Sequence, residues 1–242
     1  MEFEELKDKI VKFVKEELYS LEPWIYSCEW DEKLPKLNEL REKVKKMGLW
    51  LPQISTDYGG IGLSLQEHGE ISEILGGSPY GFYVFNCQAP DAGNMEILIE
   101  VGTSQQKKDY LTPLLEGKTR SCFAMTEPGY AGSNPTRMGT IAKKENGNYI
   151  INGHKWFTSS FDGADFAIVM VVTDPDEANP YKRASQIIVP TNSEGVEFVR
   201  NVSIMGHPGG GWESHAEIKF KNVVVPCPLY TSPSPRDRYG SR

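Results

Sequence analysis

The sequence is poor in cysteine and histidine, with four of each among its 242 residues. The cysteines form no Cys-x-x-Cys pair, and they are Cys28, Cys87, Cys122 and Cys227. The histidines show no ligand spacing either. We therefore predict no metal site and no disulfide framework, and we expect reduced thiols of the cytosolic type.

An excess of basic residues is also lacking, because the net charge is −7 and the sequence pI is about 5.3. Proteins that bind nucleic acid usually carry a basic stripe, so we exclude nucleic acid as a partner. An anionic small ligand stays open, because a local site can be positive on an acidic protein.

Long apolar runs are missing as well. The longest, Phe166–Val172, is far shorter than the roughly 20 residues that cross a bilayer. The N-terminal stretch is acidic and amphipathic, unlike a signal peptide or an Arg-rich transit peptide. We predict no membrane span and a cytoplasmic location, with mitochondria or peroxisomes as alternatives if the source is eukaryotic.

The first half of the chain has helical periodicity. Apolar residues recur at three- and four-residue steps from Phe3 to Leu18 and again from Leu37 to Met47. Capping boxes at Ser64–Glu67 and Thr103–Gln106 predict two further helix starts. This part is therefore expected to be a helical domain at residues 1–119.

After Gly117 the period changes to that of strands, and Asn146-Gly147 is a hairpin turn signal between two of them. We predict strands at 121–125, 139–144, 149–154, 165–172, 186–190, 196–200 and 215–220. Short strands at this density favour a small antiparallel β-barrel or sandwich, here at residues 120–226. The predicted fold class is α+β.

Two stretches carry the candidate chemistry. The first, Ser121–Asn134, is predicted to be a short strand that opens into a loop of small residues, which lets backbone N–H groups approach an anion. The second, Ile150–Ser160, is a strand that ends in an aromatic residue and hydroxyls. A flat redox cofactor with a pyrophosphate needs both features: amides for the phosphates, and an aromatic face with donors for the ring.

These stretches together resemble the flavin-binding signature of acyl-CoA dehydrogenases. The matching residues are Ala-Met-Thr-Glu-Pro at 124–128, Ala-Gly-Ser-Asn at 131–134 and Asn-Gly-His-Lys-Trp-Phe-Thr-Ser at 152–159. Gly132 and Ser133 come one residue later than in the common pattern. This shift and Gln88–Met95 resemble the branch of the family that includes members ten and eleven.

The resemblance implies an FAD-dependent enzyme that dehydrogenates an acyl-CoA thioester at its α and β carbons, with hydride transfer to flavin N5. It also implies electron-transfer flavoprotein as the electron acceptor and a full-length homodimer or homotetramer. An acyl-CoA oxidase or a flavin monooxygenase on the same fold stays open as an alternative. So does a non-catalytic binding module.

In the first motif, the resemblance implies that the Thr126 hydroxyl and N–H face the pyrimidine side of the flavin. Phe123 and Met125 would line the same site. Ser133 would contact the pyrophosphate or the thioester arm of the substrate. Glu127 is expected to shape the loop rather than to act as a base. Taken alone, Thr126 is more simply a strand threonine that is satisfied locally.

In the second motif, the resemblance implies that Trp156 lies beside the isoalloxazine ring and that Phe157 belongs to the same site. Thr158 would donate to flavin N5, and Ser159 would assist. The structural alternative is a core aromatic residue with surface hydroxyls. The catalytic base is unknown, because the family takes it from a region that this sequence does not show.

The stretch 227–242 breaks the pattern, since it is rich in Pro and Ser and has no periodicity. Leu229–Asp237 looks like a translated adapter sequence. We therefore expect the natural sequence to stop at about Pro226, with the C-terminal helical domain of the family missing and the fragment inactive as given.

Three other features lie outside the two motifs. The glycines of Ile204–Trp212 suit a tight bend or a close approach to a ligand. His207 is more simply structural than a phosphate contact. Lys143-Lys144 and Lys182-Arg183 are expected to be solvated faces.

Overall fold

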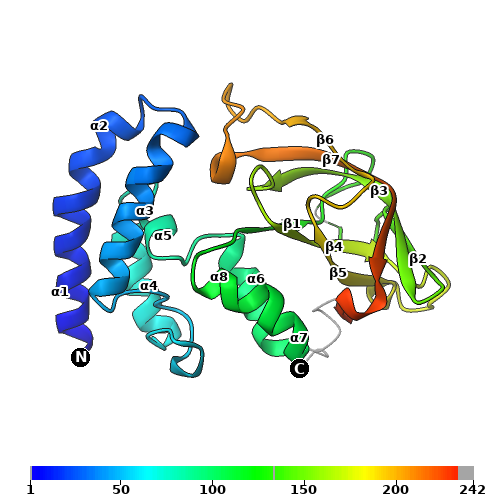
Figure 1. Cartoon of the computed structure of the whole chain (residues 1–242), viewed down its shortest axis with the longest axis horizontal. Helices are drawn as coiled ribbons and strands as arrows, with labels where there is room; N and C mark the ends of the chain where they lie inside the picture. The colour runs from blue at the N-terminus through cyan, green and yellow to red at the C-terminus, as the bar shows by residue number, and fades with distance from the viewer. Residues whose placement is uncertain (1, 133, 234–242) are drawn as a thin grey trace. The chain divides into compact units, whose positions relative to one another are not determined.

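The computed structural model describes residues 2–132 and 134–233. Its contacts divide the chain into two compact units, Met1–Glu96 and Ile97–Arg242 (Figure 1). The first unit consists of helices and the second contains the sheet. The predicted α+β class is therefore confirmed.

The first unit is built from amphipathic helices, as its periodicity predicts. Leu6, Ile10 and Phe13 lie on the buried face of the first helix. The predicted capping box at Ser64 is present, with the Glu67 N–H donating to the Ser64 side chain. The elements are α1 (Phe3–Phe13), η1 (Val14–Leu18), η2 (Tyr19–Leu21), α2 (Glu22–Ile25), α3 (Trp30–Lys46), η3 (Thr56–Tyr58), α4 (Leu65–Leu75) and α5 (Gly81–Val84).

Helix α6 (Asp91–Val101) spans the division between the units. The second unit then continues with α7 (Ser104–Gln106), η4 (Lys107–Leu111) and α8 (Thr112–Leu115). The predicted capping box at Thr103 is present here too. In the described part of the chain, no helix combines the length and the apolar character that a membrane crossing needs.

The second unit holds one curled sheet of eight strands. Along the sheet the order is β6-β7-β3-β2-β4-β5-β8, and β1 pairs with β4 off this path. The strands are β1 (Ser121–Ala124), β2 (Ile141–Glu145), β3 (Asn148–Ser159), β4 (Phe166–Val172), β5 (Ala184–Pro190), β6 (Val196–Asn201), β7 (His215–Pro226) and β8 (Tyr230–Pro233). Short 3₁₀ turns occur at η5 (Pro180–Lys182), η6 (Gly211–Glu213) and η7 (Cys227–Leu229).

The sheet is mixed rather than purely antiparallel. β1 pairs with β4 in parallel from Ser121 opposite Phe166, and β2 meets β4 in parallel at Ile141 and Val172. A parallel pair needs a long connection, and the β2–β3 hairpin supplies it between β1 and β4. The other pairs are antiparallel, and Asn146 and Gly147 turn the β2–β3 hairpin with positive φ at both positions.

The sheet curls around an apolar core of inward-facing residues. Val169 of β4, Ile187 of β5 and Ile218 of β7 are all fully buried in it. Burying such side chains contributes about 1.5–3 kcal/mol each before the entropy of folding is counted. This core fixes the strand ends that carry the candidate site.

Residues 227–233 are part of this unit, while 234–242 lie outside the described residues. The Gln106 side chain donates to the Pro228 carbonyl at 2.7 Å, and β8 pairs with β5 at Ser185 and Pro233. The predicted domain ranges 1–119, 120–226 and 227–242 stay predictions.

Candidate functional site

The two sequence motifs meet where β1 ends and β3 bends. The Trp156 N–H donates to the Thr126 carbonyl at 3.0 Å. One residue earlier on each side, the Lys155 ammonium donates to the Met125 carbonyl at 2.8 Å. Phe123 lies half-buried on β1, immediately before this junction. The structure thus brings together Thr126, Met125 and Trp156.

Trp156 and Phe157 sit on a β-bulge. Lys155 pairs with Ile218 and Thr158 pairs with Ala216, so two residues of β3 face one residue of β7. Phe157 has a φ of 50°, which is rare for a bulky side chain, and it is 40% exposed. Bulges of this kind re-aim side chains and are common beside functional sites.

The two bulge rings contact each other, with centroids 4.6 Å apart at an interplanar angle of 56°. Trp156 remains half-buried and Phe157 is exposed. An aromatic pair held at a bend in this way presents apolar ring faces, and a planar ligand could stack on one of them.

Thr158 follows the bulge and is only 1% exposed. Its Oγ1 atom is buried and makes no hydrogen bond within residues 2–132 and 134–233. Buried polar groups in native proteins nearly always have partners, because leaving one unpaired costs about 1–3 kcal/mol. The hydroxyl is therefore suited to a ligand atom that accepts or donates a hydrogen bond.

Behind this junction lies a buried ion pair that the sequence did not reveal. The Lys155 ammonium is 2.8 Å from Glu127 Oε1, and the two side chains are 0% and 4% exposed. Glu127 also accepts from the Gly139 N–H at 2.6 Å and the Thr140 N–H at 2.9 Å. Glu127 thus joins the start of the loop to its end, as its predicted loop-shaping role requires.

Burial and pairing set the charges of this pair. Burial lowers the pKa of Lys155 from its usual 10.5 to about 8, against the opposing effect of the Glu127 carboxylate. Burial alone would raise the pKa of Glu127, but the Lys155 ammonium and the N–H donors hold it below its ordinary value. Both groups are therefore charged near neutral pH.

The loop between β1 and β2 is held close to Thr126. A Cβ on Gly132 would lie 2.7 Å from the Thr126 methyl, so only glycine fits there without a shift. Asn134 Oδ1 accepts from the Thr136 N–H at 3.1 Å and the Thr136 hydroxyl at 2.6 Å. Asn134 therefore holds the loop backbone through its side-chain oxygen. Ser133, predicted to contact phosphate or substrate, lies outside the described residues.

The glycine-rich stretch forms a tight bend. Ile204 and His207 pair as an isolated bridge around a turn, and the Gly209 N–H donates to His207 Nδ1 at 3.1 Å. Gly209 and Gly211 have positive φ values of 65° and 53°. The glycines and His207 therefore have a local structural role, in agreement with the bend and structural-histidine hypotheses.

A second polar group beside the bulge was not predicted. Ser159 Oγ lies 2.8 Å from His215 Nδ1, and burial lowers the pKa of His215. Glu217 accepts a hydrogen bond from Arg200, and its Oε1 lies 2.8 Å from His154 Nε2. Both partners lower the pKa of Glu217, and the bond from Arg200 has the larger effect. Alternation along β3 and β7 could have indicated this group, but only once their register was known.

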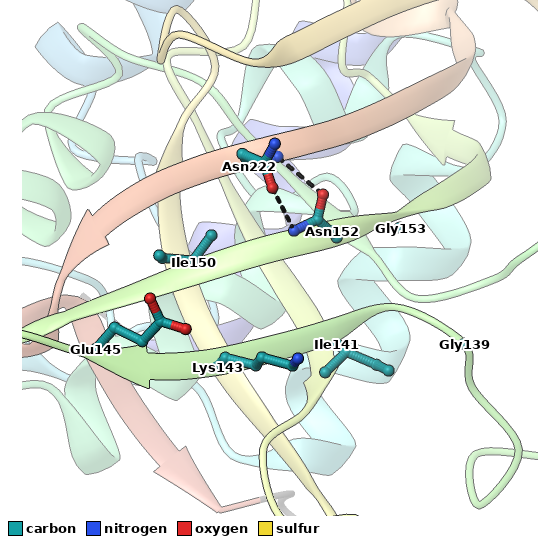
Figure 2. Close-up of a pocket in the computed structure, with 8 residues that line it drawn as sticks. All are labelled: Gly139, Ile141, Lys143, Glu145, Ile150, Asn152, Gly153 and Asn222. Atoms are coloured by element: carbon teal, nitrogen blue, oxygen red, sulfur yellow. Dashed lines mark hydrogen bonds between the residues drawn. The ribbon is translucent and has the colours of Figure 1, made fainter.

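A groove of about 620 Å³ lies on the outer face of the β2–β3 hairpin. Figure 2 shows Ile141, Lys143 and Glu145 along β2, with Asn152 of the neighbouring strand bonded twice to Asn222. Among the described residues, none of the predicted flavin contacts lines this groove. Lys143 and Lys144 are exposed, as predicted for a solvated face.

The helical and β segments both match models of one enzyme class, the acyl-CoA dehydrogenases. Residues 1–118 match the model described as "Acyl-CoA dehydrogenase, N-terminal domain", and residues 122–223 match "Acyl-CoA dehydrogenase, middle domain". The chain belongs to the acyl-CoA dehydrogenase family, and the resemblance in its motifs is thereby confirmed.

Individual relatives agree with this family. The chain is 41% identical to acyl-CoA dehydrogenase family member 10 of Mus musculus over 91% of its own length, but it covers 22% of that protein. It is 39% identical to family member 11 of Gallus gallus, covering 90% of this chain and 29% of that one. A solved structure also matches, with a TM-score of 0.88 at 33% identity. It is described as "a putative acyl-CoA dehydrogenase from Mycobacterium abscessus". That match covers 96% of this chain and 60% of the other. The chain thus spans less than a third of the length of the two relatives from Mus musculus and Gallus gallus.

Proposed function

We propose that this chain holds the flavin of an FAD-dependent acyl-CoA dehydrogenase, which removes hydrogen from the α and β carbons of an acyl-CoA thioester. The observation that carries the proposal is the junction of Thr126 and Trp156 beside the buried hydroxyl of Thr158. Within the described residues, the Thr126 N–H and the Thr158 hydroxyl make no hydrogen bond, and the aromatic rings of Trp156 and Phe157 lie at the same junction. These are the groups that a flavin ring requires.

When bound, FAD would supply the acceptor for the hydride, at its N5 atom. The chain's own residues would then bind and orient the ring. Thr158 Oγ1 would hydrogen-bond at the N5 edge and gain the partner that it lacks. Trp156 would cover one face of the ring and exclude water from it, and Thr126 would donate to the pyrimidine end.

Glu127 does not serve as the base in this proposal. Both of its carboxylate oxygens already accept hydrogen bonds, from the Gly139 and Thr140 N–H groups and from the Lys155 ammonium. A general base must reach the proton that it removes. We therefore leave the base unassigned among the described residues.

The finer parts of the proposal come from the family. We propose electron-transfer flavoprotein as the acceptor, a homodimer or homotetramer as the assembly, and a cytoplasmic location, with an organelle as the eukaryotic alternative. The acyl chain that the enzyme prefers is left open.

The test is anaerobic reduction of the bound flavin by acyl-CoAs of different chain lengths. Reduction is monitored as the loss of flavin absorbance. The protein is the product of the complete reading frame that contains this sequence. At least one acyl-CoA should bleach the flavin. Flavin that binds but is not reduced by any acyl-CoA would contradict the dehydrogenase and favour a binding module.

A pair of threonines supplies a matched comparison. Thr158→Val removes the hydroxyl assigned to N5, and we expect it to slow flavin reduction at least tenfold, the loss of about one good hydrogen bond. Thr140→Val removes another buried hydroxyl that has no partner in the described residues. That control should leave the reduction rate unchanged.

One alternative remains in the same chemistry, an oxidase or monooxygenase that passes electrons to oxygen. Oxygen consumption during turnover distinguishes it, because a dehydrogenase needs an added electron acceptor. No observation in the described residues favours this alternative.

A further inference from the structure

The peptide that links Met125 to Thr126 has its two polar groups in different environments. Its carbonyl accepts a hydrogen bond from the buried Lys155 ammonium at 2.8 Å. Its N–H, which belongs to Thr126, makes no hydrogen bond anywhere in the described part of the chain. The peptide is trans and planar, so the C=O and N–H point in opposite directions.

The ammonium that contacts this carbonyl is fixed in place. It donates to Glu127 Oε1 at 2.8 Å and lies 3.6 Å from Met138 Sδ, so both its direction and its charge are held by the surrounding side chains. Glu127 is itself fixed by the Gly139 and Thr140 N–H groups. A charged donor makes a hydrogen bond roughly twice as strong as a neutral one.

A strong donor on a carbonyl also affects the other end of the same peptide. It draws electron density toward the oxygen, and the N–H becomes a stronger donor by the cooperativity that links hydrogen bonds in chains. The direction of the N–H is fixed at the same time, since the peptide plane cannot rotate without breaking the Lys155 bond.

We propose that Lys155 is a positioning residue for the flavin: through the Met125 carbonyl it orients and polarises the Thr126 N–H toward the pyrimidine end of the ring. This inference rests on the proposed flavin function. It assigns a role to a lysine whose side chain is 0% exposed.

The role has a measurable consequence for redox chemistry. A reduced flavin carries more electron density on its pyrimidine end than an oxidised one. A stronger N–H donor there stabilises the reduced form more, so it raises the reduction potential. A residue that only supported the fold would leave the potential of bound flavin unchanged.

The experiment uses the FAD-loaded product of the complete reading frame and compares four proteins. They are the wild type, Lys155→Met, the double variant Glu127→Gln/Lys155→Met, and the control Lys143→Met, which removes an exposed lysine from the same sheet. The readouts are the dissociation constant of FAD, the midpoint potential of the bound flavin, and the thermal melting temperature.

We expect Lys155→Met to bind FAD about tenfold or more weakly, because the Thr126 N–H loses the charged bond that orients and polarises it, and to shift the potential to a more negative value. The double variant removes both buried charges, so it should regain thermal stability. It should not regain the potential or the affinity. Lys143→Met should match the wild type in all three readouts.

Two results would overturn the inference, and they differ in what else they overturn. A double variant with wild-type potential and affinity would show that Lys155 only supports the fold, while the proposed flavin function stands. A wild type that takes up no FAD would overturn the proposed function and this inference together.

Discussion

Removing the carboxylate of Glu127 should strongly destabilise the second unit, which holds the sheet. In Glu127→Ala, the Lys155 ammonium stays buried at 0% exposure without its partner. The Gly139 and Thr140 N–H groups, which donate to this carboxylate at 2.6 and 2.9 Å, also lose their acceptor. Breaking a buried pair from one side costs about 3–5 kcal/mol.

We therefore expect the free energy of unfolding to fall by about 4 kcal/mol, because the lost backbone bonds overlap with the charge term rather than adding fully. A domain of ordinary stability has about 5–15 kcal/mol, so the variant is expected to fold but to melt roughly 8–16 °C lower. The assay is urea and thermal unfolding followed by circular dichroism.

The free energy of unfolding that Glu127→Ala loses should depend on pH in a definite direction. Burial lowers the pKa of Lys155 to about 8, and losing Glu127 removes the charge that opposes this lowering. Above its folded pKa and below 10.5, the lysine binds more protons in the unfolded state, so stability rises with pH. In the variant this rise begins at a lower pH, so the stability difference from the wild type should narrow as the pH rises toward about 8.

The control is Glu145→Ala, which removes an exposed carboxylate from β2. It should stay within about 0.5 kcal/mol of the wild type. A Glu127→Ala variant that unfolds like this control, or a deficit that widens as pH rises, would refute the reasoning.

Three further predictions concern individual side chains. Trp156→Ala should weaken FAD binding by roughly 1–3 kcal/mol, measured by fluorescence titration, and an unchanged dissociation constant would argue against its place beside the ring. Burial raises the pKa of Cys87 to about 12, so iodoacetamide should label Cys28, which is half-buried, and spare Cys87 in the native protein, as mass spectrometry can show. Asn134→Asp keeps the side-chain acceptor and should change the free energy of unfolding by less than about 0.5 kcal/mol. Asn134→Ala removes the acceptor for two Thr136 bonds and should lower it by about 1 kcal/mol. Equal values for the two variants in urea unfolding would contradict the structural role of this turn.

Local signals predicted most of the fold. The capping boxes at Ser64 and Thr103 and the hairpin at Asn146-Gly147 are confirmed, because each depends on residues adjacent in sequence. The parallel pairing of β1 with β4 was not predicted. Strand direction across a sheet depends on the connections between strands, which periodicity does not record.

The candidate site was predicted in part for the same reason. Thr126 and Trp156 were found through the motifs that contain them, and the structure joins them by a hydrogen bond. Lys155 was missed, because a lysine in a strand is usually solvated and its inward direction follows only from the register of β3. Glu127 was correctly expected to shape the loop, but its partner lies 28 residues away in sequence. Such long-range pairing is invisible to local pattern.

The central claim is that the junction of Thr126, Trp156 and Thr158 holds FAD. The most direct measurement is a titration of the apo protein with FAD, monitored through the quenching of flavin fluorescence. The absorbance of the protein after gel filtration then shows whether FAD stays bound. We expect a yellow protein with one FAD per chain, which is released on denaturation and held more weakly by Trp156→Ala. A folded, colourless protein that neither quenches nor retains FAD would contradict it.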